Sequence, residues 1–386
     1  MDDGLTSKQL VRQTNGKLIL QNIFNSGTTS RAQIARDLSL NKSTVSSIYN
    51  DLMLTGLIKE VGDGEASNNG GRKPTMVTIN ATHGVTVSLD IAYRNLHYMF
   101  NYLNGEIVKI GEIRIYQRDI HEILDVIHDL IESTLPEIEN EIGLMGISIS
   151  YHGIVKDGQI LYSPFLDLDG IDLKQELWKM YPHVKITIDN EANMAALYER
   201  DFNDEQSTEN SITISIHKGI GAGIILNHTI YRGATGEAGE VGRTLTMHDG
   251  KYQTVESICS EDAIITAISE EYGEPLFRND VVDLYRKSNP IVIKRLDLFV
   301  ETIAFLMFNI AKTFDTHSFF ISSPLIEEMP EMLNAIGEQM RTIDSSIPDV
   351  YLIADADMAT LLGSCSLITH RVLDMMDYDL HFDLTK

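Results

Sequence analysis

Carboxylates, amides and glycines gather in the second half of the chain, in a pattern suited to a ligand rich in hydroxyl groups. Asn190 and Glu191 are adjacent, and Glu240 and Glu256 follow with Arg243 between them. Carboxylates accept paired hydrogen bonds from neighbouring hydroxyls inside a partly desolvated cleft, which is the chemistry of polyol recognition. Asn190, Glu191, Glu240, Arg243 and Glu256 are candidate ligand-binding residues on these chemical grounds.

Three features of this region have more than one interpretation. Arg243 either forms an ordinary salt bridge with Glu240 or binds the anionic group of a phosphorylated or carboxylated sugar. Asp189, just before Asn190, is either a helix cap or a ligand. The glycines between Gly219 and Gly223 make either a tight turn or a cradle for phosphate groups.

A different chemical pattern lies near the N-terminus. The spacing predicts a helix over about Lys42 to Thr55 with its apolar residues on one face. Short hydroxyl and amide side chains on the other face can approach base edges and phosphates in the major groove of DNA. A solvated helix of a three-helix bundle is the alternative. The predicted DNA-contacting residues of this helix are Lys42, Ser43, Thr44, Ser46, Ser47 and Asn50.

The elements around this helix favour the DNA-binding interpretation. Apolar spacing predicts a first helix from Asn15 to Gly27 and a second from Arg31 to Leu38, with Arg31 added to the DNA-contacting set. A β-hairpin then runs to Ile79 with a long glycine-rich tip. Arg72 and Lys73 leave that tip and are placed either to reach phosphates or a minor groove, or as incidental surface charges. Residues 1–80 are therefore predicted to form a winged helix-turn-helix.

The rest of the chain alternates strands and helices and repeats one theme, a strand meander followed by helices. This predicts two related α/β lobes with a cleft between them. We assign residues 81–190 and a C-terminal helix to the first lobe and 191–365 to the second. The predicted strands are 85–91, 96–102, 106–115, 146–150, 186–188, 211–217, 222–226 and 229–231, and the predicted helices are 120–133, 191–201, 261–272 and 293–313.

Charge is distributed unevenly between these parts. The whole chain carries a net charge of −25. Residues 1–80 hold nine Lys and Arg against seven Asp and Glu, whereas the remainder holds 22 against 49. The head therefore tolerates DNA and the body repels it. Neither of the two cysteines has the spacing of a zinc site or a disulfide framework, and no apolar stretch is long enough for a membrane span, so a cytoplasmic protein with reduced thiols is expected.

Several stretches together resemble the ROK family of repressors, open reading frames and kinases. The wing matches the family in Gly70-Gly71-Arg72-Lys73-Pro74. The resemblance implies an actin-like ATPase fold derived from sugar kinases, with a cleft that holds sugar and ATP in the kinases. In the body it rests on 146–164, 188–193, 219–225 and 233–242. It also implies a role in sugar binding for the five candidate ligand-binding residues.

The chain departs from the family's kinases at the positions that catalysis requires. Where they carry glycines for the nucleotide phosphates, this chain has Ala92 and Tyr93, and where they present a glycine-rich turn to adenosine it has Ser322 and Ser323. Glu191 replaces the aspartate that the kinases use as base, and its extra methylene displaces the carboxylate, which costs on the order of a hundredfold in rate. We therefore expect no catalytic residue, no enzyme activity and no cofactor.

Two sugar contacts and a metal cluster of the family are also changed. Arg243 stands where the family usually has a sugar-contacting histidine, and Phe165 stands where Pro-Asn supplies an amide. The three cysteines of the family's zinc cluster are missing between 243 and 256, so no metal is expected.

The resemblance and its departures imply a DNA-binding transcriptional regulator, a repressor of genes for carbohydrate uptake or catabolism. Its expected partners are operator DNA, a carbohydrate effector with an anionic sugar as one option, and a second copy or more of itself. The alternatives are a sugar kinase with a fused DNA-binding head, and a repressor relieved by a protein partner.

Overall fold

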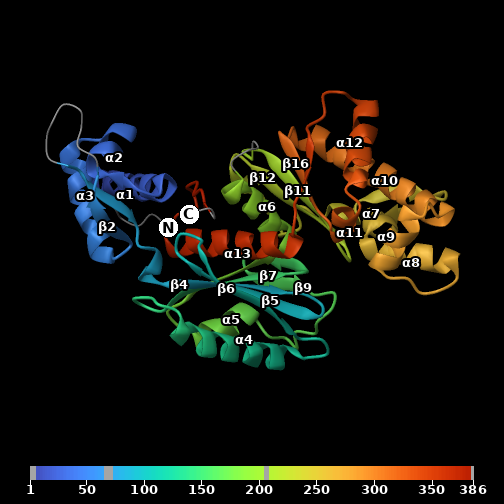
Figure 1. Ribbon diagram of the computed structural model, residues 1–386, viewed down its shortest axis with the longest axis horizontal. Coiled ribbons are helices and arrows are strands. Elements are labelled where there is room, and N and C mark those ends of the chain that lie inside the picture. Colours follow the sequence, from blue (N-terminus) through green and yellow to red (C-terminus); the bar gives the residue numbers. More distant parts are fainter. Residues whose placement is uncertain (1–5, 65–72, 204–207, 384–386) are drawn as a thin grey trace.

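The structure is a computed structural model of the chain, and it describes residues 6–64, 73–203 and 208–383. A small N-terminal head lies at one end and the two α/β lobes of the body follow it (Figure 1). Across these ranges, no helix has the length and apolar character needed to span a membrane.

Over residues 6–64 and 73–80, the head contains three helices and a three-stranded sheet in the order β1-β3-β2. The third helix has the predicted bounds, but the first starts at Ser7 instead of Asn15, because Thr6 and Gln9 form a capping box ahead of the apolar repeat. Residues 6–14 are exposed and so carry no apolar periodicity. The elements are α1 (Ser7–Ser26), β1 (Thr29–Ser30), α2 (Arg31–Asp37), α3 (Lys42–Thr55), β2 (Ile58–Asp63) and β3 (Thr75–Ile79).

The first lobe is built on a five-stranded sheet in the order β10-β7-β4-β5-β6. β4 pairs antiparallel with β5, while β7 lies parallel to both β4 and β10. Helices α4 and α5 lie on one side of this sheet and α13 (Ala356–Val372) on the other (Figure 1). The bounds are η1 (Ala81–His83), β4 (Val85–Ile91), β5 (Asn95–Tyr102), β6 (Ile107–Arg114), α4 (Ile120–Thr134), η2 (Leu135–Glu137), β7 (Leu144–Tyr151), β8 (Ile154–Lys156), β9 (Gln159–Tyr162), α5 (Leu173–Met180) and β10 (Lys185–Asn190).

The second lobe repeats this plan with a sheet in the order β13-β12-β11-β16-β17. Here β11, β12 and β13 form the antiparallel meander, and β16 and β17 continue the sheet in parallel. The bounds are α6 (Glu191–Phe202), β11 (Ser211–Ile216), β12 (Ile220–Leu226), β13 (Thr229–Ile230), η3 (Val241–Arg243), β14 (Leu245–His248), β15 (Lys251–Thr254), α7 (Val255–Cys259), α8 (Glu261–Tyr272), α9 (Arg278–Arg286), α10 (Pro290–Phe314), β16 (Ser318–Ser322), α11 (Pro324–Glu328), α12 (Glu331–Ile343) and β17 (Val350–Leu352).

Helix α13 (Ala356–Val372) returns the chain to the first lobe, where it packs on β4 and β7 and against α6. The domain boundary that we expected at residue 365 falls inside this helix. The last strand of the second lobe ends at Leu352, so the crossover comes earlier than the sequence suggested.

The head is not isolated from the body. Its apolar core continues into residues from the end of the chain, including Leu373, Met375, Leu380 and Phe382. The sequence carried no expectation of this contact. Because one apolar core joins the head to the C-terminal segment, the position of the head depends on that segment.

Candidate DNA-binding face and effector cleft

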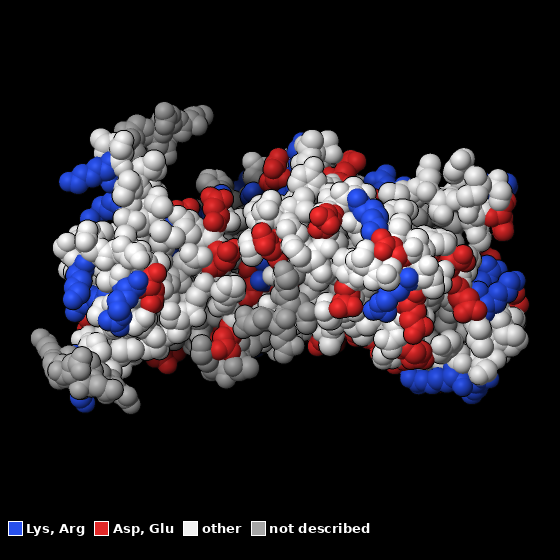
Figure 2. All heavy atoms as spheres, turned by 90° about the horizontal axis from the view of Figure 1, so that it is seen from above, with Lys and Arg blue, Asp and Glu red and all other residues white. Residues whose placement is uncertain are grey.

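Helix α3 presents the polar face that its sequence predicted. Val45, Ile48 and Tyr49 are buried against the head's core. On the other side, Lys42, Ser43, Ser47 and Asn50 are exposed, and Thr44 and Ser46 are half-buried. On the view in Figure 2, Lys and Arg side chains of the head gather toward its outer end, while Asp and Glu side chains are spread over the body. This arrangement leaves a weakly positive, polar helix face at the end of the molecule farthest from the acidic body.

Arg31 is held beside that face by an aromatic contact. Its guanidinium carbon lies 4.8 Å from the centroid of the Tyr49 ring, and the Tyr49 hydroxyl donates a hydrogen bond to Glu60 at 3.0 Å. Burial, together with the Glu60 carboxylate, raises the pKa of Tyr49 to about 12. Tyr49 therefore ties α2, α3 and the wing strand β2 together and fixes the direction of Arg31.

One contact on this face was missed from the sequence. Arg12 of α1 donates a hydrogen bond to the Ser47 hydroxyl at 3.1 Å and pairs with Asp51. The expectation that the first helix begins at Asn15 hid this residue. Ser47 is therefore already engaged by the protein, whereas Ser43 and Asn50 project from the exposed side of α3.

Of the two basic residues predicted at the wing, Lys73 lies within the described residues and Arg72 does not. Lys73 is exposed just before β3. Arg72 lies outside the described residues, as do the glycines before it. At the base of the wing, the Gly64 amide donates a hydrogen bond to the Pro74 carbonyl oxygen at 2.8 Å. This bond continues the pairing of β2 with β3.

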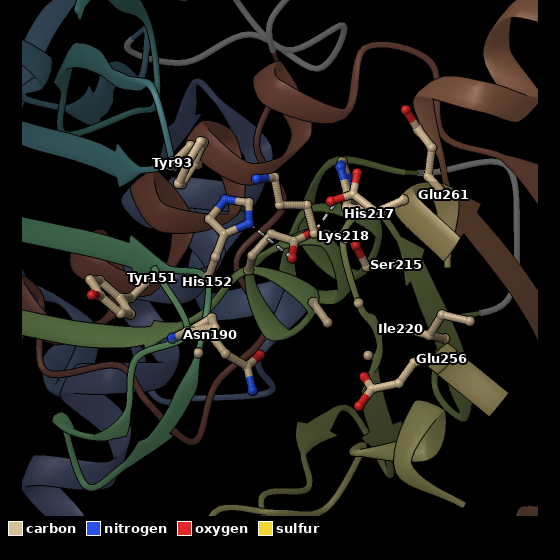
Figure 3. A pocket seen from close by; sticks show the side chains of 18 of the residues that line it. Tyr93, Tyr151, His152, Asn190, Ser215, His217, Lys218, Ile220, Glu256 and Glu261 are labelled. Atoms are coloured by element: carbon tan, nitrogen blue, oxygen red, sulfur yellow. Dashed lines mark hydrogen bonds and ion pairs between the residues drawn. The ribbon is translucent and has the colours of Figure 1, made fainter. Parts of the chain in front are cut away.

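A cavity of about 730 Å³ separates the two lobes. In Figure 3, Tyr93, Tyr151 and His152 enter it from the first lobe, and Ser215, His217, Lys218 and Glu256 enter it from the second. Asn190 and Glu191 stand between them, where β10 ends and α6 begins. A pocket of this size is ample for a small ligand.

Four of the five predicted ligand-binding residues line this cavity, and Arg243 does not. Asn190, Glu240 and Glu256 all line it. The side-chain oxygen Oδ1 of Asn190 caps α6 by accepting a hydrogen bond from the backbone N–H of Asn193 at 2.8 Å. This bond fixes the orientation of the Asn190 side chain. Burial raises the pKa of Glu240, and Glu256 adds to the effect while Arg243 opposes it. The two carboxylates are thus close enough to interact electrostatically. Their oxygens can accept hydrogen bonds from the hydroxyls of a polyol ligand.

Arg243 does not join them. Its side chain is exposed on η3, and it is not among the residues that line the cavity. Arg243 acts on Glu240 only through its charge, which opposes the rise in the Glu240 pKa, and the two form no salt bridge within the described residues. Asp189 does not cap α6, whose cap is Asn190, and it does not line the cavity. It pairs with Arg232, whose Nε lies 2.7 Å from its Oδ2, and it accepts a hydrogen bond from the Asn193 amide side chain at 2.7 Å.

Glu191, at the position of the kinase base, has both carboxylate oxygens engaged by the protein. Ser215 donates to Oε1, and His217 Nε2 lies 3.2 Å from the same oxygen. Oε2 lies 3.6 Å from Nδ1 of His152, whose Nε2 is 3.3 Å from Asp90. Because these partners come from both lobes, Glu191 links the two lobes. The cluster was not predicted, since only Glu191 was singled out from the sequence.

The nucleotide side of the cleft is also altered. Tyr93 lines the cavity where the kinases carry glycine, and Lys218 Nζ lies 3.5 Å from the centroid of its ring. This cation–π contact again joins the two lobes. Ser322 is buried in β16, and Ser323 caps α11 by accepting from the Ile326 amide at 3.4 Å. Neither serine lines the cavity.

His152 provides a pH-dependent test of the cross-lobe cluster. Burial opposes a charge on its ring, but the carboxylates of Asp90 and Glu191 outweigh burial and raise its pKa to about 9 from the ordinary 6.5. The stabilisation is therefore complete below about pH 6.5 and is lost as the pH rises through about 9. We expect His152→Gln to lower the free energy of unfolding by about 2 kcal/mol at neutral pH, and the two proteins to converge above about pH 9. Urea unfolding from pH 6 to 10 measures this, and a pH-independent difference would contradict it.

Within the described residues, the cleft has neither a cluster that could hold a metal ion nor a cysteine in its lining. Over the described ranges, no three His, Cys, Asp or Glu side chains are grouped to hold a metal ion. Cys259 and Cys365 are both free and buried, as predicted. Burial raises the pKa of the Cys259 thiol to about 11 and that of Cys365 to about 12, so neither is a reactive thiolate.

Comparisons with known proteins agree with this arrangement. A sequence profile of the ROK family matches residues 86–370. The chain is 43% identical over 385 residues to the xylose repressor of Lactiplantibacillus pentosus, which covers 99% of both chains. A crystal structure of a ROK family transcriptional regulator homologous to the Escherichia coli MLC protein superposes with a TM-score of 0.79 at 20% identity, covering 95% of this chain and 98% of that one. A ROK hexokinase from Thermus thermophilus gives a TM-score of 0.62 at 17% identity, over 75% and 99%.

A winged head fused to a two-lobed, actin-like body without a working phosphotransfer site defines a DNA-binding regulator built on a sugar-kinase fold. The chain belongs to the ROK family. Within that family it is a sugar-responsive transcriptional repressor and not an enzyme.

Proposed function

We propose that this chain represses genes for the uptake or catabolism of xylose or a closely related neutral pentose, and that the sugar releases it from its operator. One observation carries the proposal. The sugar side of the cleft keeps Asn190, Glu240 and Glu256, while its nucleotide side is occupied by Tyr93 and Lys218. Such a cleft is suited to bind a sugar without transferring a phosphate to it. The name of the L. pentosus relative supports xylose as the sugar.

A neutral effector is favoured over an anionic one. Arg243, the cation expected to hold an anionic group, is exposed outside the cavity. Glu240 and Glu256 both line it, close enough to interact electrostatically, and their charges repel a phosphate or carboxylate. We therefore expect xylose to raise the melting temperature more than a sugar phosphate or a uronate does.

Operator binding is assigned to the exposed face of α3 together with Arg31 and the wing. A single head with so small a positive balance makes few phosphate contacts. We propose that a homodimer places two heads on a palindrome, because linkage of two weak sites raises the effective affinity. The effector would then act by changing the spacing of the heads, which must match half-sites about 34 to 36 Å apart or a multiple of that. A repressor of this kind acts in the cytoplasm, where operator and sugar meet.

The proposal is tested by two measurements on the full chain. Thermal shifts with xylose, glucose, a sugar phosphate, a uronate and ATP rank the ligands. Binding of DNA from the chain's own upstream region, with and without each ligand, then shows which of them acts on repression, with Arg72→Ala as a variant expected to bind DNA weakly. Stabilisation by xylose and release from DNA support the proposal. Specific DNA binding that no sugar changes would point instead to relief by a protein partner, and stabilisation by ATP would favour the kinase.

A further inference from the structure

Two helices begin at the cleft and end beside the head. Helix α6 starts with Glu191, which lines the cavity, and ends at Phe202. Helix α13 carries Asp357, which also lines the cavity, in its first turn and ends at Val372. The two helices pack against each other, and the end of α13 lies near the head (Figure 1). They are the structural connection between the ligand-binding cleft and the head.

Helix α6 is approached so closely by its neighbours that only glycine fits at two of the contacts. A Cβ atom at Gly363 of α13 would clash with the carbonyl oxygen of Met194 in α6. A Cβ atom at Gly223 of β12 would clash with the carbonyl oxygen of Ala192. Contacts of this kind leave no free volume between the layers, so a displacement at one end is passed to the other.

A buried ionic cluster fastens the two helices at the end next to the head. Asp201 of α6 is buried, pairs with the neighbouring Arg200, and lies 3.0 Å from Nε2 of His370 in α13. Ser366 of α13 donates to the same carboxylate. Burial alone would raise the pKa of Asp201, but Arg200 and His370 outweigh burial and hold it far below its usual range.

The C-terminal segment 373–383 joins this cluster to the head. The Phe382 amide donates a hydrogen bond to the Asp201 carbonyl at 2.9 Å. Its ring is stacked on Phe202 with the centroids 4.7 Å apart, and it meets Phe24 of α1 edge-on at 5.0 Å. Phe382 thus contacts the end of α6 and the head with one side chain.

Polar contacts hold α1 on the same segment. Lys17 Nζ donates to the carbonyl oxygen of Asp374 at 2.7 Å and pairs with its carboxylate. Gln21 and Asn25 donate to the carbonyl oxygen of Asp379 at 2.9 and 3.1 Å. Because these donors occupy successive turns of α1, the segment fixes both the place and the direction of the head's first helix.

We propose that segment 373–383 is the surface on which the body positions its DNA-binding head, and that Phe382 is the positioning residue through which the cleft acts on DNA binding. The inference rests on the proposed function in one respect, that a sugar binds in the cleft. A sugar that binds Asn190, which lines the cavity and caps α6, shifts the start of α6, against which α13 packs. Since the two helices move together, Phe202 carries Phe382 and α1 with it.

The test compares Phe382→Ala with Phe382→Leu and with Asp377→Ala, an exposed change in the same segment. Affinity for xylose is measured by calorimetry and affinity for operator by fluorescence anisotropy with and without xylose. We expect all proteins to bind xylose within about twofold of wild type. The sugar-induced loss of operator affinity, about tenfold or more in wild type, should fall below about twofold in Phe382→Ala and persist in the other two. An unchanged loss in Phe382→Ala would overturn the inference.

A second measurement does not depend on the identity of the effector. Hydrogen exchange on the sugar-free proteins reports whether α1 is still held. Phe382→Ala should speed exchange in the second half of α1 by about tenfold while α4, in the first lobe, keeps its protection. Equal protection of α1 in Phe382→Ala and wild type would refute the positioning role, whether or not xylose is the effector. A different pair of results is that xylose leaves operator binding by the wild type unchanged while Phe382→Ala still loses protection of α1. That pair of results would count against xylose as the effector and not against the positioning role.

Discussion

Ser43→Asp should abolish useful operator binding while leaving sugar binding intact. Ser43 is exposed in the first turn of α3, where a carboxylate favours the helix through its dipole, so the head should remain folded. Facing DNA, the same carboxylate repels phosphates and removes a hydroxyl from the recognition face. Losing one good base contact costs about 1–3 kcal/mol, and the proposed dimer would have two heads, so we expect operator affinity to fall roughly a hundredfold.

The control for that experiment is Thr342→Asp. It adds the same charge at an exposed position on α12 of the body, away from the head. Fluorescence anisotropy with labelled operator compares the three proteins, and a thermal shift with xylose checks that the cleft is intact. If Thr342→Asp weakened binding as much as Ser43→Asp, total charge and not the α3 face would explain the loss.

Glu256→Gln should produce a repressor that stays on its operator in the presence of sugar. Glu256 lines the sugar side of the cleft from the first turn of α7, beside Gly219, which leaves room for its carboxylate. A hydrogen bond to a charged group is worth about 1.5–3 kcal/mol, so replacing the carboxylate by an amide should weaken sugar binding by roughly 10- to 100-fold. Operator affinity without sugar should not change, because Glu256 is far from the head.

Glu237→Gln is the matched control for Glu256→Gln. It makes the same chemical change at an exposed residue of the loop that carries Glu240, and Glu237 does not line the cavity. Calorimetry with xylose and anisotropy with operator should find this control indistinguishable from wild type. Sugar binding that survives in Glu256→Gln would move the effector site away from this end of the cleft.

The sequence predicted most elements because their residues are patterned locally. Helices α3 and α8 have the predicted bounds, and the strands of both meanders lie within a few residues of their expected ranges. The start of α1 was wrong because Ser7 to Thr14 form an exposed helix without apolar periodicity. Local pattern therefore fails where a helix extends beyond the core it packs on.

The site was harder to predict because its geometry depends on distant residues. Asn190, Glu240 and Glu256 meet in one cavity, as expected from their chemistry. Arg243 is close to them in sequence, yet the turn of η3 leaves it exposed. His152 and His217 reach Glu191 from different lobes, and neither has a local pattern that marks it. Phe382 contacts Phe24 of the head, although the two residues lie near opposite ends of the sequence. Neither local sequence contains a pattern that predicts this contact.

If this chain couples a sugar in its cleft to an operator on its head, the two ligands must be thermodynamically linked. The affinity for xylose is measured by calorimetry on the free protein and on the protein saturated with operator. If the two ligands are linked, operator weakens xylose binding by the same factor, about tenfold or more, by which xylose weakens operator binding. Equal xylose affinities in the two states would show that sugar and DNA do not communicate, and would contradict the account.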